Sequence, residues 1–356
     1  MKRSVLVAAA LVLVGSLALA GSVAAAHKKS SKPFTAALVS DIGKFNDKGF
    51  NQDQLAGLNR AVARLGVKKI ALQSYSSSDY LPNLTTAVRE GANIVSAAGY
   101  LLAPTLAQVA SQFPNVDFTI TDDSVRGPDF KNAKSIKNIE GLVYASNQAG
   151  CLVGYLAGEM VKAAGGKQVI GAVGGIKIPA VDDYIVGYNY CAHLADRRIK
   201  VLVGYSQDFV AQDKCKAITQ NQIGQGSKVE FQVAGGCGLG TLNAAAQAGI
   251  WGIGVDVDQY KLAKHVLTSA LKRVDVGIFD AIKQAKEGKF KGGHDLLFDL
   301  NNNGVGVGKI SPKVPKAFIK KMDALKAKII AGKVKVPVAK GSPLLGLLRG
   351  ARVGKT

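Results

Sequence analysis

Within eleven residues, the sequence gathers five side chains that can hold a small polar molecule. Asp41, Asn46, Asp47, Phe50 and Asn51 provide carboxylate and amide groups and one aromatic ring. Carboxylates accept hydrogen bonds from ring N–H and hydroxyl groups, and an aromatic ring stacks on a flat ligand. The cluster contains no nucleophile with a neighbouring base, so its composition favours binding over catalysis.

Other candidates follow the ends of extended segments further along the chain. Tyr100 and Phe209 come after two such ends, and Phe50 and Phe209 belong to corresponding halves of the sequence. We expect these last two rings to hold a flat ring between them. Asp122 and Asp256 are placed to accept hydrogen bonds from the same ligand. The alternative is that aromatic residues at loop tips are simply buried under a lobe.

Lys272, in the segment TSALK, follows a carboxylate at a strand end and could donate to ligand hydroxyl groups. A lysine at the start of a helix is otherwise solvated. For Asp41 the alternative role is helix capping or hinge structure. Asp122 has Asp123 beside it, and one of these two carboxylates could be exposed.

The familiar catalytic and cofactor motifs are missing from the sequence. It has no G-x-S-x-G, no H-E-x-x-H and no P-loop, and its four histidines are scattered. The glycine run at 235–240 with Asp256 resembles a dinucleotide loop, but Thr241 breaks the G-x-G-x-x-G register. We therefore expect no cofactor and no catalysis. In that run Gly235 allows the backbone to approach a ligand closely.

Alternating strands and helices must position these residues. The apolar run 34–39 ends at Asp41, and a helix with Leu55, Leu58 and Val62 on one face follows the turn. Strand patterns recur in two series, at 34–39, 67–73, 93–98 and 116–121, and at 168–173, 199–205, 229–233 and 250–255. Such alternation predicts an α/β fold with doubly wound parallel sheets, whose ligands bind beyond the carboxyl ends of the strands.

The two series echo each other. Gly99 and Asp122 end adjacent predicted strands of the first series, 23 residues apart, and Gly235 and Asp256 do so in the second, 21 residues apart. Two similar lobes facing each other across a cleft would explain this repetition.

The chain of 356 residues begins like an exported precursor. Two basic residues precede an apolar stretch at 5–19, which is too short for a comfortable membrane span, and small residues follow at 24–26. We expect a signal peptide at 1–26 and a periplasmic, extracellular or envelope-associated protein. The alternative is an uncleaved anchor. A lipid anchor is not supported, because no cysteine follows the apolar stretch.

The net charge of +21 is unevenly distributed. Residues 313–356 contain twelve Lys and Arg against one acid, a net charge of +11. This segment could contact anionic lipid or an envelope polymer, or be a solvated helix at 315–331 with a loose end. We expect no nucleic-acid binding, because the basic residues are not interleaved with aromatic ones.

Four cysteines remain after the expected cleavage, and none lies in a CxxC motif. This spacing argues against a metal site or a redox pair, and an oxidising compartment favours disulfides. Cys151 with Cys191, and Cys215 with Cys237, are the plausible pairs.

Several segments resemble the basic membrane protein family, which includes the purine nucleoside receptor-type substrate-binding proteins of ABC importers. The resemblance runs from Phe34 to Ile310. Its motifs are VSDIGKFNDKGFNQ at 39–52, AAGY at 97–100, VGGIKIP at 173–179, AGGCGLGTLNAA at 234–245, GVDVDQ at 254–259 and LTSALKRVD at 267–275. Gly49 stands where the family commonly has Ser, the family's lipid-modified cysteine is absent, and the family does not explain the basic tail.

The resemblance implies a type I periplasmic-binding-protein fold, with two lobes joined by three crossovers. It places the first lobe at 34–143 and 257–290, the second at 144–256 and 291–312, and a C-terminal helix and basic tail at 313–356. A purine would stack between Phe50 and Phe209. The remaining wall would comprise Asp41, Asn51, Gly99, Tyr100, Asp122, Gly235, Asp256 and Lys272, with the last two holding ribose hydroxyls.

We therefore expect a monomeric binding protein that delivers a purine nucleoside to an ABC permease. The alternatives are a sugar or another small polar metabolite as the ligand, an extracellular nucleoside-processing enzyme, and an envelope adhesin that uses the basic tail.

Overall fold

The structure is a computed structural model that describes residues 32–130 and 137–347. The expected signal peptide and the end of the basic tail, 348–356, lie outside the described residues. From Pro33 onward the described residues belong to one compact unit. Within the described ranges, the helices are all too short or too polar to cross a bilayer.

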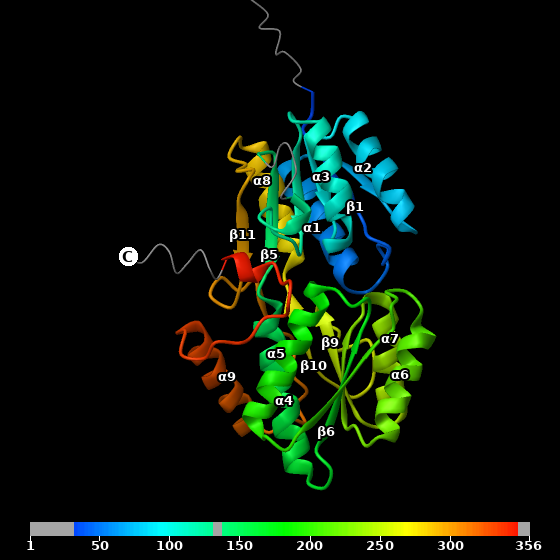
Figure 1. Cartoon of the computed structure of the whole chain (residues 1–356), viewed down its shortest axis with the longest axis vertical. Coiled ribbons are helices and arrows are strands. Elements are labelled where there is room, and N and C mark those ends of the chain that lie inside the picture. Colours follow the sequence, from blue (N-terminus) through cyan, green and yellow to red (C-terminus); the bar gives the residue numbers. More distant parts are fainter. Residues whose placement is uncertain (1–31, 131–136, 348–356) are drawn as a thin grey trace, which may run out of the picture. The chain divides into compact units, whose positions relative to one another are not determined.

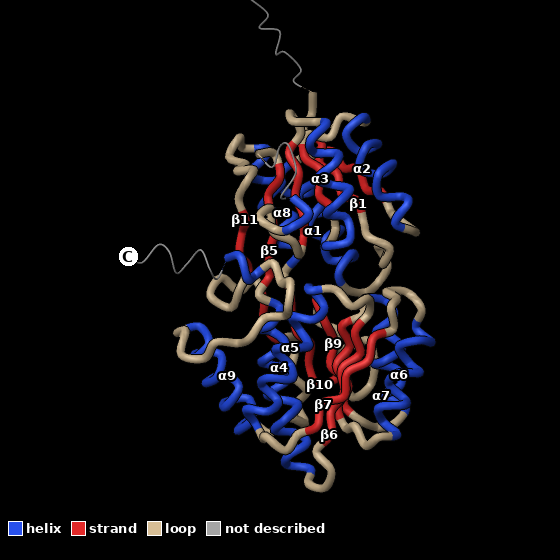
Figure 2. The backbone as a smooth tube through the Cα atoms, in the orientation of Figure 1, coloured by secondary structure: helices blue, strands red, loops and turns tan. Residues whose placement is uncertain are grey.

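The first lobe is built on a six-stranded parallel sheet with the order β11-β5-β4-β3-β1-β2. Its strands are β1 (Thr35–Val39), β2 (Lys68–Leu72), β3 (Ile94–Ala97), β4 (Asp117–Thr121), β5 (Ile139–Tyr144) and β11 (Asp295–Phe298). Its helices are α1 (Phe50–Leu65), α2 (Tyr80–Arg89), α3 (Ala103–Gln112) and α8 (Val274–Lys286), with 3₁₀ turns η1 (Ser77–Asp79), η2 (Tyr100–Leu102) and η3 (Pro128–Phe130). Strands β1 and β5 are buried along their whole length because helices cover both faces of the sheet (Figure 2).

The second lobe contains another six-stranded sheet, with the order β12-β10-β9-β8-β6-β7 and only β12 antiparallel to its neighbour. Its strands are β6 (Val169–Gly174), β7 (Lys200–Tyr205), β8 (Val229–Val233), β9 (Trp251–Asp256), β10 (Val266–Lys272) and β12 (Val305–Val307). Its helices are α4 (Ser146–Ala164), α5 (Pro179–Ala195), α6 (Gln212–Gly224) and α7 (Gly238–Gln247), with the 3₁₀ turn η4 (Gly235–Cys237). Helices α4 and α5 lie on one side of this sheet, and α6 and α7 lie on the other (Figure 1).

The chain crosses between the two sheets three times: after β5, after β10, and between β11 and β12. The predicted fold class is therefore confirmed. The lobe boundaries differ in two places. β10 was expected in the first lobe but pairs with β9 in the second, and β11 was expected in the second but pairs with β5 in the first. The apolar pattern of a strand identifies it as a strand, but it does not identify the sheet with which it pairs.

Helices α4 and α5 pack unusually closely. A side chain on Gly150 or Gly154 of α4 would overlap backbone atoms of α5, and one on Gly187 would overlap the backbone of α4. The disulfide Cys151–Cys191 joins the same two helices. The second disulfide, Cys215–Cys237, joins α6 to η4. These are the two pairs named from the sequence.

The C-terminal segment folds back onto the second lobe. Helix α9 (Lys316–Ile330) buries Met322, Leu325 and Ile329 and packs on α4. The chain then passes beside α5, as the red segment in Figure 1 shows. There Asp183 accepts hydrogen bonds from the Ala339 amide, at 2.8 Å, and from the Ser342 hydroxyl, at 2.6 Å. The basic segment is therefore packed against the lobe as far as Ser342.

The core of the second lobe contains a fully buried acid in its sheet, Glu230 of β8, which is 0% exposed. Burial raises the pKa of Glu230 to about 8. Gly171 on the adjacent β6 leaves the room for this carboxyl, because a side chain there would overlap both Glu230 and Gln222. The folded protein therefore holds a proton on Glu230 at neutral pH.

We expect the Glu230→Gln variant to gain stability relative to the parent as the pH rises. An unfolded glutamate releases its proton near 4.5, whereas the folded one keeps it up to about 8. Between these values, retaining the proton costs the parent about 1.4 kcal/mol of unfolding free energy per pH unit, and glutamine avoids this loss. Urea unfolding at several pH values measures the difference. The exposed Glu90→Gln is the control, and a Glu230→Gln difference that is constant with pH would refute the prediction.

Candidate functional site

The carboxyl ends of strands from both sheets surround one cavity. Its volume is about 60 Å³. The cavity is lined by Asp41, Gly43, Asp47, Phe50, Asn51, Gly99, Tyr100, Leu101, Asp122, Ile178, Ala180, Val181, Tyr184, Phe209, Val233, Gly235, Asp256 and Lys272. Every binding residue predicted from the sequence lines it except Asn46. Because 60 Å³ holds only a few water molecules, a ring-sized ligand can enter only if the walls move apart.

The exception, Asn46, is exposed on the loop between β1 and α1. The buried polar residue of this loop is its neighbour Asp47, 4% exposed, whose carboxylate accepts hydrogen bonds from the Gly49, Asn51 and Gln52 amides at 2.8–3.1 Å. These contacts satisfy the free N–H groups at the start of α1. The expectation for Asn46 as a wall residue is therefore wrong, because capping the helix turns the side chain of Asp47 inward instead.

Asp41 and Asn51 hold each other in the wall of the cavity. Asp41 Oδ1 accepts hydrogen bonds from Asn51 Nδ2 and from the Gly43 amide, both at 2.7 Å. Burial raises the pKa of Asp41 to about 7, although these two hydrogen bonds favour the charged form. Near neutral pH the carboxyl can therefore either accept or donate a hydrogen bond. The alternative role of Asp41 as a helix cap is not what the structure shows, because Asp47 caps α1 and Asp41 lines the cavity.

One phenylalanine from each lobe borders the cavity. Phe50 belongs to α1 of the first lobe and Phe209 follows β7 of the second. Gly99 has a φ of +113°, and a side chain there would come within 3.1 Å of the Phe50 ring. Gly235, with a φ of +55°, packs against Phe209. Each glycine therefore lets the backbone approach one of the two rings.

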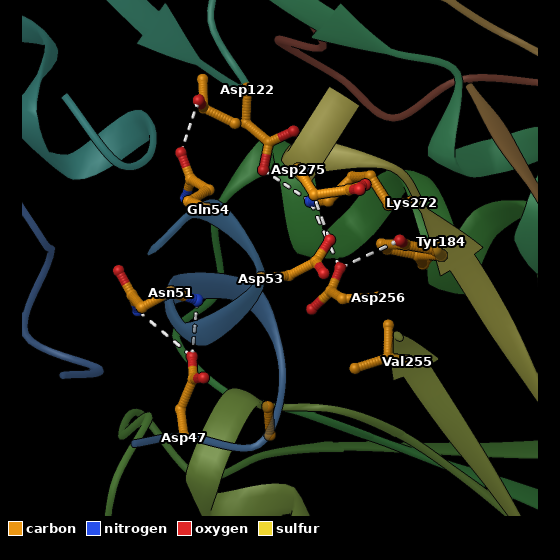
Figure 3. Close-up of polar contacts among 12 residues, drawn as sticks. Asp47, Asn51, Asp53, Gln54, Asp122, Tyr184, Val255, Asp256, Lys272 and Asp275 are labelled. Atoms are coloured by element: carbon orange, nitrogen blue, oxygen red, sulfur yellow. Dashed lines mark hydrogen bonds and ion pairs between the residues drawn. The ribbon is translucent and has the colours of Figure 1, made fainter. Parts of the chain in front are cut away.

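Lys272, at the end of β10, connects the two lobes electrostatically (Figure 3). It is 3% exposed, and its Nζ lies 2.6 Å from Asp122 Oδ2 and 3.5 Å from Asp256 Oδ1. Burial alone would lower the pKa of Lys272, but the two carboxylates raise it above its usual value. Burial also raises the pKa of Asp122, which the attraction of Lys272 only partly offsets. Lys272 is therefore charged and buried at the same time. The alternative of a solvated lysine is wrong.

Asp122 and Asp256 occupy matching places in the two lobes. Asp122 directly follows β4, Asp256 ends β9, and both have left-handed backbone conformations with φ of 65° and 63°. Non-glycine residues seldom adopt this conformation. Here it turns each carboxylate into the cavity. Neighbouring Asp123 is buried rather than exposed, at 2%, and accepts a hydrogen bond from the Ser124 amide.

Sequence reasoning missed Tyr184 and the apolar part of the wall. The Tyr184 hydroxyl donates a hydrogen bond to Asp256 Oδ1 at 3.1 Å (Figure 3). Tyr184 lies near the start of α5, the helix after the first strand of the second lobe, which is where Phe50 lies in the first lobe. Applying the internal repeat to this helix would have identified it. The apolar wall residues are Leu101, Ile178, Ala180, Val181 and Val233.

The glycine run after β8 serves packing rather than a phosphate. A side chain on Gly238 would overlap Gln232, and one on Gly240 would overlap the Gln212 backbone. These two glycines allow α7 to pack against its neighbours. Among the residues described, no cluster of three or more His, Cys, Asp or Glu is placed to hold a metal ion.

We expect Lys272→Met to destabilise the protein by about 3–5 kcal/mol, because it leaves two buried carboxylates without their cation. Urea unfolding measures the loss. Lys309→Met is the matched control, since Lys309 is exposed and its Nζ lies 4.5 Å from the centre of the Tyr260 ring, the same distance as Lys272 from Phe50. Adding Asp122→Asn to Lys272→Met should restore part of the lost stability, because it removes one of the two unpaired carboxylates. Equal losses in Lys272→Met and Lys309→Met would contradict the role of the ion pair.

Sequence comparison identifies relatives along most of the chain. A family described as "ABC transporter substrate-binding protein PnrA-like" matches residues 34–340. A CD4+ T-cell-stimulating antigen of Listeria monocytogenes is 32% identical, over 87% of this chain and 89% of that protein. The ABC transporter nucleoside-binding protein BmpA of Lactococcus lactis subsp. cremoris is 30% identical, over 95% of this chain and 99% of that protein.

Solved structures show the same fold. An ABC transporter solute-binding protein from Aeropyrum pernix K1 aligns with a TM-score of 0.77 at 24% identity, covering 86% of this chain and 94% of that one. The fold, the ordered wall residues and the family match from 34 to 340 lead to one conclusion. The chain belongs to the Bmp family, the PnrA-like substrate-binding proteins of ABC transporters.

Proposed function

We propose that the chain binds a purine nucleoside between its lobes and delivers it to an ABC importer. The observation that carries this proposal is the pairing of one aromatic ring from each lobe, Phe50 and Phe209, around a cavity rich in carboxylates. A flat base fits between two rings. A ribose carries the hydroxyl groups that carboxylates and a lysine can bind.

The expected energies support a useful affinity. Stacking a base on an aromatic side chain contributes about 1–3 kcal/mol, and a hydrogen bond to a charged group contributes about 1.5–3 kcal/mol. Asp41 and Asn51 would contact the base or ribose, and Asp256 and Lys272 the ribose hydroxyls. Two stacking faces and several such hydrogen bonds are enough for micromolar binding after the cost of association.

The charges of the wall favour an uncharged ligand. Asp41, Asp47, Asp122 and Asp256 line the cavity, and Lys272 is the one basic residue among the lining residues. Two of these carboxylates already engage that lysine. A phosphate group would face the remaining carboxylates, so a nucleoside suits this wall better than a nucleotide.

Relatives support a small-molecule ligand but differ in its class. The Lactococcus lactis relative is named a nucleoside-binding protein. Two proteins of the same fold, only 14% identical, were solved with D-allose and with β-D-fucofuranose. A sugar is therefore the second candidate. The two phenylalanines, one from each lobe, favour the nucleoside, because a flat base would present an aromatic surface to both rings.

The proposed role in transport comes with three further proposals. We propose export directed by the segment 1–26, a monomer in solution, and opening of the lobes by hinge motion to admit the ligand. The basic residues near the C-terminus would add a peripheral contact with the envelope. Substrate-binding proteins of ABC importers are exported or envelope-associated, in agreement with this location.

We expect inosine or adenosine to raise the melting temperature of the parent protein, and sugars and nucleoside monophosphates to have little effect. A ligand at 100 times its dissociation constant stabilises a protein by about 2.7 kcal/mol. Thermal shift followed by calorimetric titration measures both the stabilisation and the affinity. A response to sugars alone would replace the nucleoside by the second candidate, and no response from either class would reject both.

We expect Phe50→Ala to weaken nucleoside binding by at least about tenfold, because it removes one stacking face. Calorimetric titration measures this change. Phe318→Ala, which removes a partly buried ring of α9 far from the cavity wall, is the matched control. Equal affinities in both variants would show that the ligand does not lie against Phe50.

Prolonged incubation with inosine tests the enzymatic alternative. Chromatography should recover the nucleoside intact, because the wall residues include no nucleophile paired with a base. Release of the free base in proportion to protein concentration would contradict a pure binding function.

A further inference from the structure

We propose that Gln259 is a latch between the lobes, a positioning residue that makes its decisive hydrogen bond only when they are closed. This inference rests on the proposed function, because the latch would control how long a captured ligand stays. Gln259 follows the cavity residue Asp256 by three positions but does not line the cavity. Its role would be to hold the walls together rather than to touch the ligand.

The second lobe holds the Gln259 side chain in one orientation. This side chain is 0% exposed, and its Oε1 accepts hydrogen bonds from the Val255 amide at 3.1 Å and from Gln232 Nε2 at 2.7 Å. The backbone N–H of Gln259 donates a hydrogen bond to Ser269 Oγ at 3.0 Å. Because Oε1 accepts from two donors, the side-chain amide of Gln259 cannot be flipped without losing both of these hydrogen bonds. Its Nε2 is therefore fixed as the outward donor.

The acceptor for Nε2 belongs to the first lobe. Gln259 Nε2 donates to the Lys48 carbonyl at 2.9 Å. Lys48 has a left-handed φ of 55° and lies in the loop between Asp47, whose carboxylate caps α1, and Phe50. The backbone conformation that presents this carbonyl is thus part of the loop that builds the first wall of the cavity.

Residues of the two lobes lie close together around this hydrogen bond. A Cβ atom added to Gly49 would lie at ordinary van der Waals distance from the second lobe, 3.8 Å from Gln259 Nε2 and 3.9 Å from Asp256 Oδ2. The site can accommodate the Ser that the family commonly carries there. Closing the lobes therefore brings Lys48 directly onto Gln259.

Opening the lobes would break one hydrogen bond of Gln259 and keep the others. The hydrogen bonds of Gln259 to Val255, Gln232 and Ser269 lie within the second lobe and survive opening. Only the hydrogen bond to Lys48 crosses between lobes and must break. Gln259 therefore stabilises the closed state relative to the open one, and loss of its donor should speed ligand release without slowing capture.

The test compares Gln259→Met with Gln232→Met. Both variants remove the buried hydrogen bond between the two glutamines, but only Gln259→Met removes the donor to Lys48. Stopped-flow kinetics with inosine should show a dissociation rate roughly 3–10 times the parent value in Gln259→Met, the equivalent of one neutral hydrogen bond, and an unchanged association rate. Gln232→Met should lose thermal stability yet keep the parent dissociation rate.

A second measurement needs no ligand. Dyes attached at Glu90→Cys in the first lobe and Gln220→Cys in the second report the closed fraction by single-molecule energy transfer, since both positions are exposed and the native cysteines are paired. Gln259→Met should shift the distribution toward the open state, and Gln232→Met should not. Identical distributions in the parent and Gln259→Met, or equal rate changes in both variants, overturn the latch. Failure of the parent to bind any nucleoside rejects the proposed function, while the dye measurement still decides the latch.

Discussion

One buried ammonium group must be neutralised by carboxylates from two different lobes. Lys272 carries this charge, Asp122 of the first lobe approaches it to 2.6 Å, and Asp256 of the second to 3.5 Å. An unpaired ion in such a place costs several kcal/mol, so the strand ends that carry the three groups are constrained to meet. The cavity lies at this meeting point, and the positions of the aromatic and amide groups follow from it.

The same requirement accounts for the backbone at the two strand ends. Left-handed conformations at Asp122 and Asp256 are unfavourable for residues with side chains, and they persist where the surroundings compensate for the cost. Continuing the pleat at either position would instead direct the carboxylate out of one face of its sheet. The internal repeat thus includes the backbone conformation of Asp122 and Asp256 as well as their residue type. Each lobe contributes one of the two carboxylates beside Lys272.

Much of this arrangement could be predicted from the sequence, because apolar runs fix the strands and ligands of parallel sheets bind at their carboxyl ends. The rest depends on contacts that no local pattern encodes. Asp47 rather than Asn46 faces inward because it caps α1. β10 joins the second sheet by pairing with β9, as Leu271 does with Asp256. Tyr184 resembles any helical tyrosine until its hydroxyl is seen to reach Asp256.

The two disulfides make the second lobe more resistant to unfolding than the first. Cys151–Cys191 and Cys215–Cys237 close loops with sequence separations of 40 and 22 residues, all within the second lobe. Cross-links of this size typically contribute about 2–4 kcal/mol each by restricting the unfolded chain. The first lobe has only its packing to keep it folded. Heat or protease should therefore attack the half that carries Phe50 first, and a reducing environment would remove the advantage of the other half.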